Sequence, residues 1–170
     1  MKRLAIILTS MCIFLSLHAQ EDATFRFGYL SYEAALQSMP DYAVVQQKLS
    51  DLRQQYQDET LRVEDEFNRK YEEFLEGQRE FPKTILQKRQ TELQELMERN
   101  IKFKENSQEE LSNTEKSLMA PLKIRLIETI GKIGRDRGYA FIVDTDNQAL
   151  PFINPAMGDD VTQFVQNALK

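Results

Sequence analysis

Cysteine and histidine are almost absent: the 170-residue chain has one of each, Cys12 and His18. Both lie near the N-terminus, in a segment with the features of an export signal. The rest of the chain therefore offers no thiolate and no imidazole. This excludes disulfides, Cys or His metal sites, Ser-His-Asp or Cys-His nucleophilic machinery and a histidine pH switch. We expect no metal and no cofactor.

The N-terminal segment has the charge and hydropathy pattern of a secretory signal. Lys2 and Arg3 precede an apolar run from Leu4 to Leu17, and Ala19 is a small residue behind which a signal peptidase can cut. We therefore predict a cleavable signal peptide, a mature chain that begins near Gln20, and a periplasmic location.

Long hydrophobic runs are missing elsewhere. The N-terminal run is shorter than the ~18 residues that a spanning helix needs, and no later segment is apolar enough, so we predict no stable membrane insertion. An uncleaved N-terminal anchor is the alternative interpretation. A lipoprotein signal at Cys12 is disfavoured because Met11 before it is large and apolar sequence follows.

A surplus of basic residues is also lacking. The net charge is −5, and removal of Lys2 and Arg3 takes it to −7. Neutralisation of phosphates needs excess Lys and Arg, so we expect no nucleic-acid partner. Charged residues are abundant, while glycine and proline are scarce through the middle of the chain. That balance favours long helices over disorder.

The first long helix is predicted from Asp41 to Gly77. Its apolar residues advance in steps of four, three and four, which is an eleven-residue repeat close to the natural pitch of an α-helix. The stripe is narrow, so the helix needs a neighbour along its length. Its members are Val45, Leu49, Leu52, Tyr56, Val63, Phe67, Tyr71 and Phe74, with Thr60 filling one gap.

A second helix is predicted from Lys83 to Asp136, after a turn between Gly77 and Pro82. Pro82 suits the start of a helix because its missing N–H is not needed there. Pro121 predicts either a kink or a stop and restart of the helix. The apolar stripe of this second helix consists of Leu86, Leu93, Met97, Leu111, Leu118, Leu122, Leu126, Ile130 and Ile133.

Charge favours antiparallel pairing of the two helices. Residues 58–76 carry eight acids and three bases, whereas residues 79–104 carry seven bases and four acids. Exposed pairs of this kind contribute only tenths of a kcal/mol each, so they set register more than stability.

Strand-like segments flank the helices. Phe25–Leu30 reads as a strand, and Ser31 is positioned to cap a short helix, Tyr32–Met39. After Gly138 we predict strands at 139–144 and 149–153, joined by a tight turn at 145–148. Asp144 to Asn147 lacks the glycine and glutamate of a calcium loop.

A last helix is predicted to start at Asp159 or Asp160 and to end at Leu169, with Val161, Phe164, Val165 and Ala168 facing inward. Together the terminal segments are too short to bury a sufficient core. We therefore predict that this part of the molecule is completed by oligomerisation.

Three segments carry a resemblance to the Skp/OmpH family of periplasmic chaperones. They are GYAFIVD at 138–144, LPF at 150–152 followed by Asn154 and Pro155, and DDVTQFV at 159–165. The resemblance extends over the mature chain. It implies a homotrimer in which strands of three subunits form a small β body and three helical arms surround a cavity. It also implies that the cavity holds unfolded outer-membrane β-barrel proteins without ATP.

One feature departs from that family. Its best-known members are strongly basic, and a basic surface attracts acidic clients and lipopolysaccharide, whereas this chain is acidic. Lipopolysaccharide binding is therefore not carried over to this chain.

The predicted fold class is mainly α with a small β body: a long antiparallel α-helical coiled-coil hairpin on a small β-barrel-like oligomerisation body. Residues 1–19 are the signal peptide, residues 20–39 with 138–170 form the body and trimerisation domain, and residues 40–137 form the arm, with its tip near 77–82.

Two groups of candidate site residues follow. Apolar residues near the tip exceed what one narrow seam needs, and Met suits indiscriminate contact. Phe81 is the preferred binding residue because it lies in the turn, whereas Phe74 is also explained by the seam. The candidate client-binding residues are Phe74, Phe81, Ile85, Met97 and Phe103; the candidate body and interface residues are Phe27, Tyr29, Ile142, Val143, Leu150, Phe152, Val161 and Val165.

Two other classes of function stay open from the sequence. A structural coiled-coil spacer of the cell envelope explains the helices equally well, but leaves the tip aromatics and the terminal strands unexplained. A carboxylate-based enzyme is disfavoured because no polar cluster suggests a pocket. We therefore predict a protein that is not an enzyme.

Overall fold

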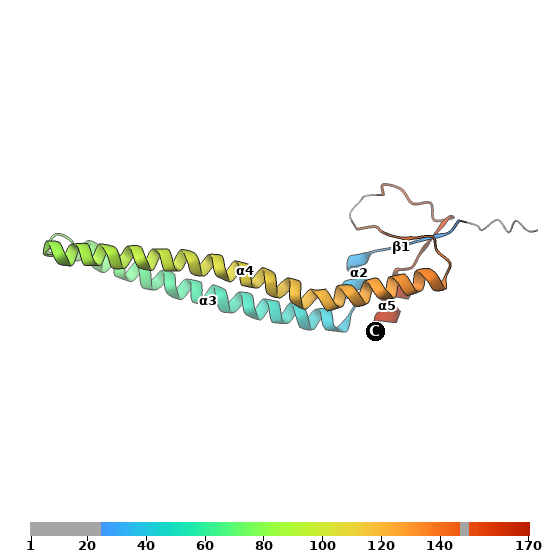
Figure 1. Ribbon diagram of the computed structural model, residues 1–170, viewed down its shortest axis with the longest axis horizontal. Helices are drawn as coiled ribbons and strands as arrows, with labels where there is room; N and C mark the ends of the chain where they lie inside the picture. The colour runs from blue at the N-terminus through green and yellow to red at the C-terminus, as the bar shows by residue number, and fades with distance from the viewer. Residues whose placement is uncertain (1–24, 147–149) are drawn as a thin grey trace, which may run out of the picture.

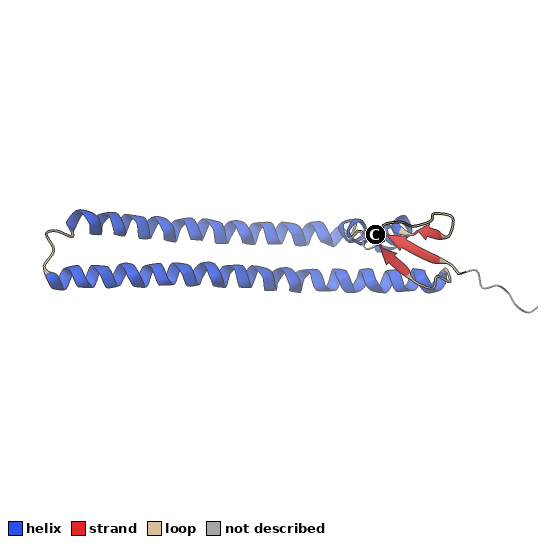
Figure 2. Cartoon of the chain, turned by 90° about the horizontal axis from the view of Figure 1, so that it is seen from above, coloured by secondary structure: helices blue, strands red, loops and turns tan. Residues whose placement is uncertain are grey.

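The computed structural model describes residues 25–146 and 150–170. The predicted signal peptide, and part of the turn predicted at 145–148, lie outside the described residues. Two long helices form a narrow arm, and a small body of strands and short helices lies at one end of it (Figures 1 and 2). The molecule is therefore mainly helical, as predicted.

The arm consists of α3 (Pro40–Gly77) and α4 (Lys83–Asp136). Pro40 occupies the first turn of α3 and Pro82 immediately precedes α4, positions where the missing proline N–H removes no helical hydrogen bond. At ~1.5 Å per residue, the 38 residues of α3 extend ~57 Å and the 54 residues of α4 extend ~80 Å.

Polar contacts between α3 and α4 show that the helices run antiparallel. Asp41 lies 3.8 Å from Arg125, Arg53 lies 3.5 Å from Glu115, and Glu64 pairs with Lys104. As the partner on α3 advances, the partner on α4 recedes. The predicted antiparallel arrangement is confirmed, and the three exposed pairs fix the relative position of the helices more than they stabilise them.

The predicted apolar stripes largely face each other. Val45 and Leu49 are buried on α3, and Leu122 and Leu126 are buried on α4. The prediction is wrong for two residues: Tyr71 is 44% exposed, and Met97 is 46% exposed. The neighbouring Leu96 is buried in place of Met97, and the buried Met119 was also missed. A step of three residues from Leu93 reaches Leu96, whereas a step of four reaches Met97. Helical periodicity alone therefore does not decide which of the two is buried.

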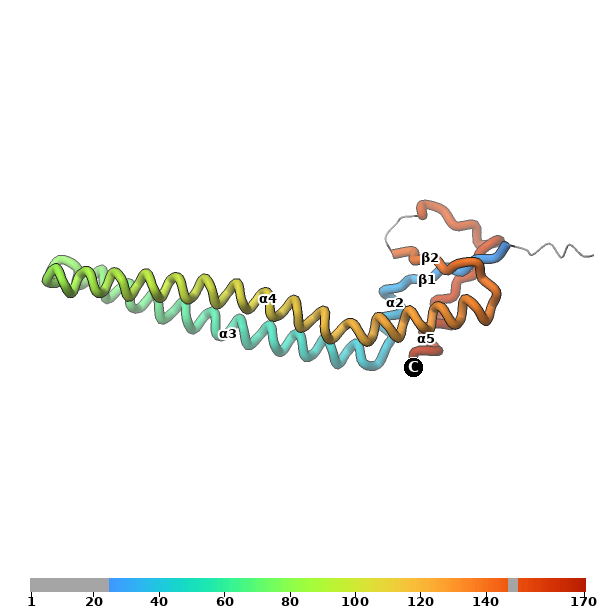
Figure 3. The backbone as a smooth tube through the Cα atoms, in the orientation of Figure 1, coloured from blue at the N-terminus to red at the C-terminus, as the bar shows by residue number. Residues whose placement is uncertain are grey.

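Pro121 neither ends α4 nor starts a new helix, so the predicted stop and restart is wrong. Helical structure continues through it to Asp136. In the tube view α4 bends gently where it reaches the body (Figure 3). Because α4 packs there against other elements of the body, tertiary contacts hold the helical path despite the missing hydrogen bond.

The body contains an open three-stranded sheet. β1 (Phe27–Leu30) lies in the centre, with β2 (Ile142–Asp144) on one side and β3 (Gly158–Asp160) on the other, and both pairs are parallel. Gly28 is opposite Ile142 and also opposite Asp159. Among the described residues of the chain, the sheet is not closed into a barrel.

Two predictions for this region are wrong: the strand at 149–153, and the hairpin that this strand was to form with the strand at 139–144. Of this segment, residues 150–153 are described and are not a strand, and the third strand lies later, at β3. Pro151 has no N–H for a ladder, which disfavours a strand there. The segment GDD of β3 has low strand propensity. Its backbone nevertheless pairs with β1, and the Val161 N–H donates to the Tyr29 carbonyl at 2.9 Å.

Gly158 packs closely against the Phe27 ring in β3. A Cβ atom at this position would lie 2.4 Å from the ring of Phe27. Such a contact is far shorter than van der Waals separation, so a larger residue at position 158 would displace the Phe27 ring.

Two short helices complete the body core. Ser31 accepts a hydrogen bond from the Ala34 N–H at 3.0 Å and caps α2 (Tyr32–Gln37), as predicted. Asp160 accepts from the Thr162 N–H at the start of α5 (Thr162–Leu169). Both helices pack on α4. Their buried residues and those of α4 form one core, which includes Leu36, Met39, Leu126, Val161, Val165 and Leu169.

The inward face predicted for α5 is partly wrong. Phe164 is exposed and lies under the guanidinium of Arg137, with 3.6 Å from the guanidinium carbon to the ring centroid. Ala168 is also exposed, and Leu169 is buried in its place.

A polar cluster ties the start of β1 to β3. The Tyr139 hydroxyl donates to the Asp159 carboxylate at 2.7 Å, and Arg26 pairs with the same carboxylate at 2.6 Å. These two partners hold the pKa of Asp159 below its usual range. Burial and the Asp159 bond raise the pKa of Tyr139. Asp159 therefore joins both segments while ionised.

The core position of Leu126 gives the first prediction. We expect Leu126→Ala to lower the free energy of unfolding by ~2–5 kcal/mol, because Leu126 is fully buried and a cavity would remain. The same change at the exposed Leu61 should stay within ~0.5 kcal/mol. Chemical denaturation at one fixed protein concentration measures both. Equal effects of the two variants would contradict the packing described.

The second prediction concerns the pH dependence of Asp159. Its folded pKa lies below the ordinary value of 3.8, so its contribution to stability is present above that value and is lost as the pH falls through the folded pKa. We expect Asp159→Asn to lower Tm at pH 7 and to lower it by less at acidic pH, below the folded pKa of Asp159, where the unaltered carboxyl is neutral as well. Asp65→Asn, on the exposed face of α3, is the control. A loss of Tm that is the same at both pH values would refute the ionised role.

Candidate binding surface

The tip of the arm is a compact turn in which Phe81 folds back on the end of α3. The Phe81 and Glu80 N–H groups both donate to the Gly77 carbonyl, at 3.2 and 3.0 Å. A Cβ atom on Gly77 would lie 2.3 Å from the ring of Phe81, so the ring sits directly against the helix backbone. Phe81 therefore lies in the turn between the helices, with its ring packed on the end of α3.

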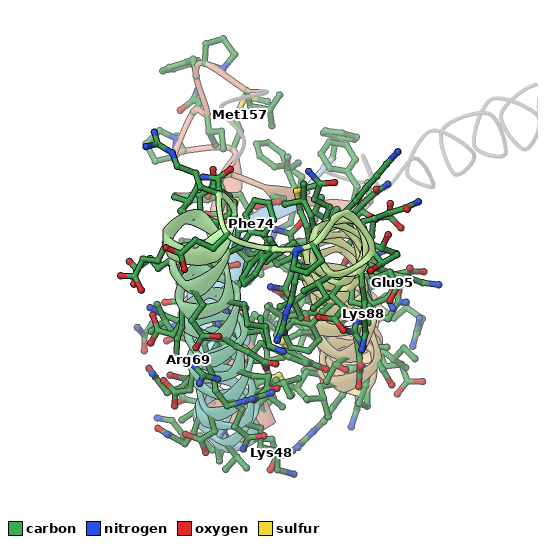
Figure 4. All side chains as sticks on the ribbon, turned by 90° about the vertical axis from the view of Figure 1, so that its left-hand side faces the viewer. Lys48, Arg69, Phe74, Lys88, Glu95 and Met157 are labelled. Carbon is green, nitrogen blue, oxygen red and sulfur yellow. The ribbon has the colours of Figure 1, made fainter. Side chains whose placement is uncertain are left out.

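Phe81 covers a cavity of about 140 Å³ between the ends of the two helices. Phe74 and Leu93 form its other apolar walls, and all three side chains are half-buried. Figure 4 looks along the arm at this end, with Phe74 and Arg69 labelled. Phe74 and Phe81, two of the candidate client-binding residues, thus line the same cavity.

Other predicted tip residues project from the arm. Ile85 is 44% exposed and Met97 is 46% exposed. Met97 lies with Phe67 and Ile101 along a groove of about 260 Å³ between α3 and α4. Phe103 differs, because it is half-buried in the seam with its ring edge on Tyr56, at 6.3 Å between centroids. The five candidate residues therefore lie in four separate places rather than in one patch.

Sequence reasoning missed part of this exposed apolar surface. Ile101 is 51% exposed, and Leu61 and Leu75 are exposed as well. Ile101 follows Met97 by four residues, so both lie on one face of α4. That spacing could have identified Ile101 once Met97 was assigned to the outer face.

The body residues predicted for core and interface divide into two groups. Val161 and Val165 are fully buried, and Phe27, Tyr29, Ile142 and Val143 are half-buried in or beside the sheet. By contrast, Leu150 and Phe152 are exposed, and Phe152 reaches 77%.

An aromatic cluster lies at the end of the sheet that carries the start of β1. The Phe27 and Phe141 rings are stacked at 5.6 Å, and Phe25 meets Phe141 edge-on at 5.6 Å. Phe25 and Phe141 are exposed. The body thus presents aromatic surface next to an open sheet.

Shifted pKa values mark structural contacts. A hydrogen bond to Glu110 raises the pKa of Tyr56 across the arm seam. Backbone N–H donors at the start of α2, led by that of Glu33, lower the pKa of Asp146. In the described ranges, no group of three or more Asp, Glu, His or Cys residues is arranged to hold a metal. No helix in these ranges has the length and hydropathy to cross a membrane.

The contact between Phe81 and Gly77 gives a prediction that uses the lack of tryptophan in the chain. We expect Phe81→Trp to emit at a shorter wavelength than a solvated indole, because the ring packs on α3. Adding Gly77→Ala should shift the emission to longer wavelength, since the new methyl group occupies the space of the ring. Gly131→Ala, farther along α4, is the control. Solvated emission from the single variant would contradict the packing.

Comparison with known proteins agrees with this architecture. No curated protein matches the chain. Among solved structures, a candidate outer membrane chaperone (OmpH-like) from Caulobacter crescentus superimposes with a TM-score of 0.69 at 19% identity, covering 84% of this chain and 82% of that one. This likeness shows a shared fold. The family model described as outer membrane protein (OmpH-like) matches residues 26–169. Since that match covers nearly all of the described residues, the chain belongs to the OmpH-like family.

Proposed function

We propose that the chain is an ATP-independent periplasmic holdase chaperone that encloses unfolded outer-membrane proteins between helical arms and prevents their aggregation. One observation carries the proposal: the arm exposes large apolar side chains outside its own seam. Ile85, Met97 and Ile101 project from α4, and Leu61 and Leu75 project from α3. A helical pair that served only as a spacer would have no use for them.

The spacing of these side chains suits weak and repeated contact. They are separated by charged residues along the arm, so each can contact a short apolar segment of an extended chain. Many such contacts give strong total binding by multivalency, although each one exchanges rapidly. Met97 adds an adaptable side chain. A client is released when it finds a more favourable apolar environment in a membrane, without a nucleotide.

Assembly as a homotrimer belongs to the same proposal. The edges of β2 and β3 have no strand beside them within the described part of the chain, and open edges favour pairing with another copy. Pairing of the β2 edge of one copy with the β3 edge of the next is a head-to-tail contact that can close into a ring. Phe25, Phe141 and Phe152 supply exposed aromatic surface for it.

In this assembly the residues 20–39 and 138–170 form the body, residues 40–137 form the arm, and residues 1–19 direct export and are removed. The barrel-like closure of the body then arises between chains. Binding does not depend on long-range attraction to acidic partners, because the chain has a net charge of −5. We therefore do not include lipopolysaccharide among the proposed ligands.

Suppression of aggregation tests the proposal. A denatured outer-membrane β-barrel protein is diluted into buffer with the chaperone, and light scattering is recorded. We expect Ile85→Ser, Met97→Ser and Ile101→Ser combined to require several-fold more protein for the same suppression, because three contact points are removed. Helix content and native mass should be unchanged, since all three side chains are exposed.

The matched control replaces the exposed Gln87, Gln90 and Gln94 of the same helix by Ser. It should suppress aggregation as the unaltered protein does. If the unaltered protein leaves scattering unchanged, the holdase proposal fails and an envelope spacer is favoured. A native mass of one chain would refute the proposed assembly.

A further inference from the structure

The cavity at the tip contains a cation without a counterion. Arg69 and Arg89, which line it, have carboxylate neighbours: Glu73 at 3.8 Å and Glu92 at 3.2 Å. Lys70 lines the same cavity and is half-buried, and none of the described residues forms an ion pair or hydrogen bond with it. Arg69 and Arg89 each have a carboxylate partner, and an anionic ligand in the cavity would supply one for Lys70.

The rest of the cavity is suited to one ring. Phe74, Phe81 and Leu93 form its apolar walls, and its volume is about 140 Å³. An apolar cavity of ~150 Å³ is known to accept a benzene molecule. The tip therefore has space for one aromatic side chain and little more.

The charges around the cavity select among anions. Three cations are accompanied by Glu73 and Glu92, so the lining carries one net positive charge. A phosphate monoester carries two negative charges and no N–H or O–H donor, so both carboxylates would repel it. A terminal carboxylate carries one charge, and the amide N–H of the same residue can donate to a carboxylate.

We propose that this cavity binds the C-terminal residue of an extended polypeptide, with an aromatic side chain between Phe74 and Phe81 and the terminal carboxylate at Lys70. Capture of a terminal carboxylate is a recurrent mode of peptide recognition. The inference rests on the proposed function and deepens it. It adds to the diffuse apolar contacts of the arm one specific contact that recognises the end of a client.

Phe81 preorganises the cavity for this ligand. Its ring is held against Gly77, so the wall of the cavity is in place before a ligand arrives. A preformed wall lowers the entropy cost of binding. A client end held at the tip would leave the remainder of the client free to contact Ile85, Met97 and Ile101 farther along α4.

Fluorescence anisotropy of a labelled ten-residue peptide tests the inference. The peptide consists of glycine and serine with a C-terminal phenylalanine, and it is compared with the same peptide as its C-terminal amide. We expect the free acid to bind about tenfold more tightly than the amide, the usual range for a charge-assisted bond. Lys70→Met should abolish that preference. Lys48→Met, at an exposed lysine near the start of the same helix (labelled in Figure 4), should preserve it.

A second variant tests the aromatic part. Gly77→Ala keeps every charge but displaces the Phe81 ring, so both peptides should bind more weakly while the preference for the free acid is retained. Equal binding of acid and amide by the unaltered protein would overturn the inference. So would Lys70-dependent binding of vesicles of anionic phospholipid that displaces the peptide, which would identify a lipid site.

These outcomes are distinguishable from failure of the holdase proposal. If the peptides show no preference while aggregation of the β-barrel protein is still suppressed, only the tip inference falls. If the peptides bind as expected but scattering is unaffected, the tip is a peptide site on a protein that is not a holdase.

Discussion

The mutual burial of two narrow apolar stripes is the constraint on which the molecule depends. Neither α3 nor α4 has enough apolar surface to fold alone, and each supplies the other along the whole arm. The seam is strongest beside the body, where Leu49, Leu122 and Leu126 are buried. Toward the tip most seam residues are only half-buried. The arm is thus anchored firmly at one end and held by lighter contacts at the other.

Polar residues in the middle of the seam limit how much apolar surface the two helices bury. Asn100 donates to the Val63 carbonyl across the helices at 2.9 Å, and the buried Ser107 donates to the Phe103 carbonyl of its own helix. Such bonds satisfy the buried groups but add little apolar area. The arm therefore remains narrow, and apolar side chains outside the seam stay available for other molecules.

Periodicity predicted the arm well, while the β segments were harder to place. The stripe from Val45 to Phe74, the turn before Pro82 and the Ser31 cap are all local signals, and the structure confirms them except at Tyr71, which is exposed. The strand Gly158–Asp160 has no such signal, because its place is fixed by pairing with β1 from the other end of the chain. Similarly, Lys70 resembles any surface lysine until the folded tip brings Phe81 beside it.

The sheet joins segments that are far apart in the chain. Ser31, directly after β1, bonds to Thr162, 131 residues later. β1 therefore gains its partner β3 only when nearly the whole polypeptide has been synthesised. The helical hairpin closes a large part of that loop first, which lowers the entropy cost of bringing the ends together. The arm is in this sense a folding scaffold for the body that carries it.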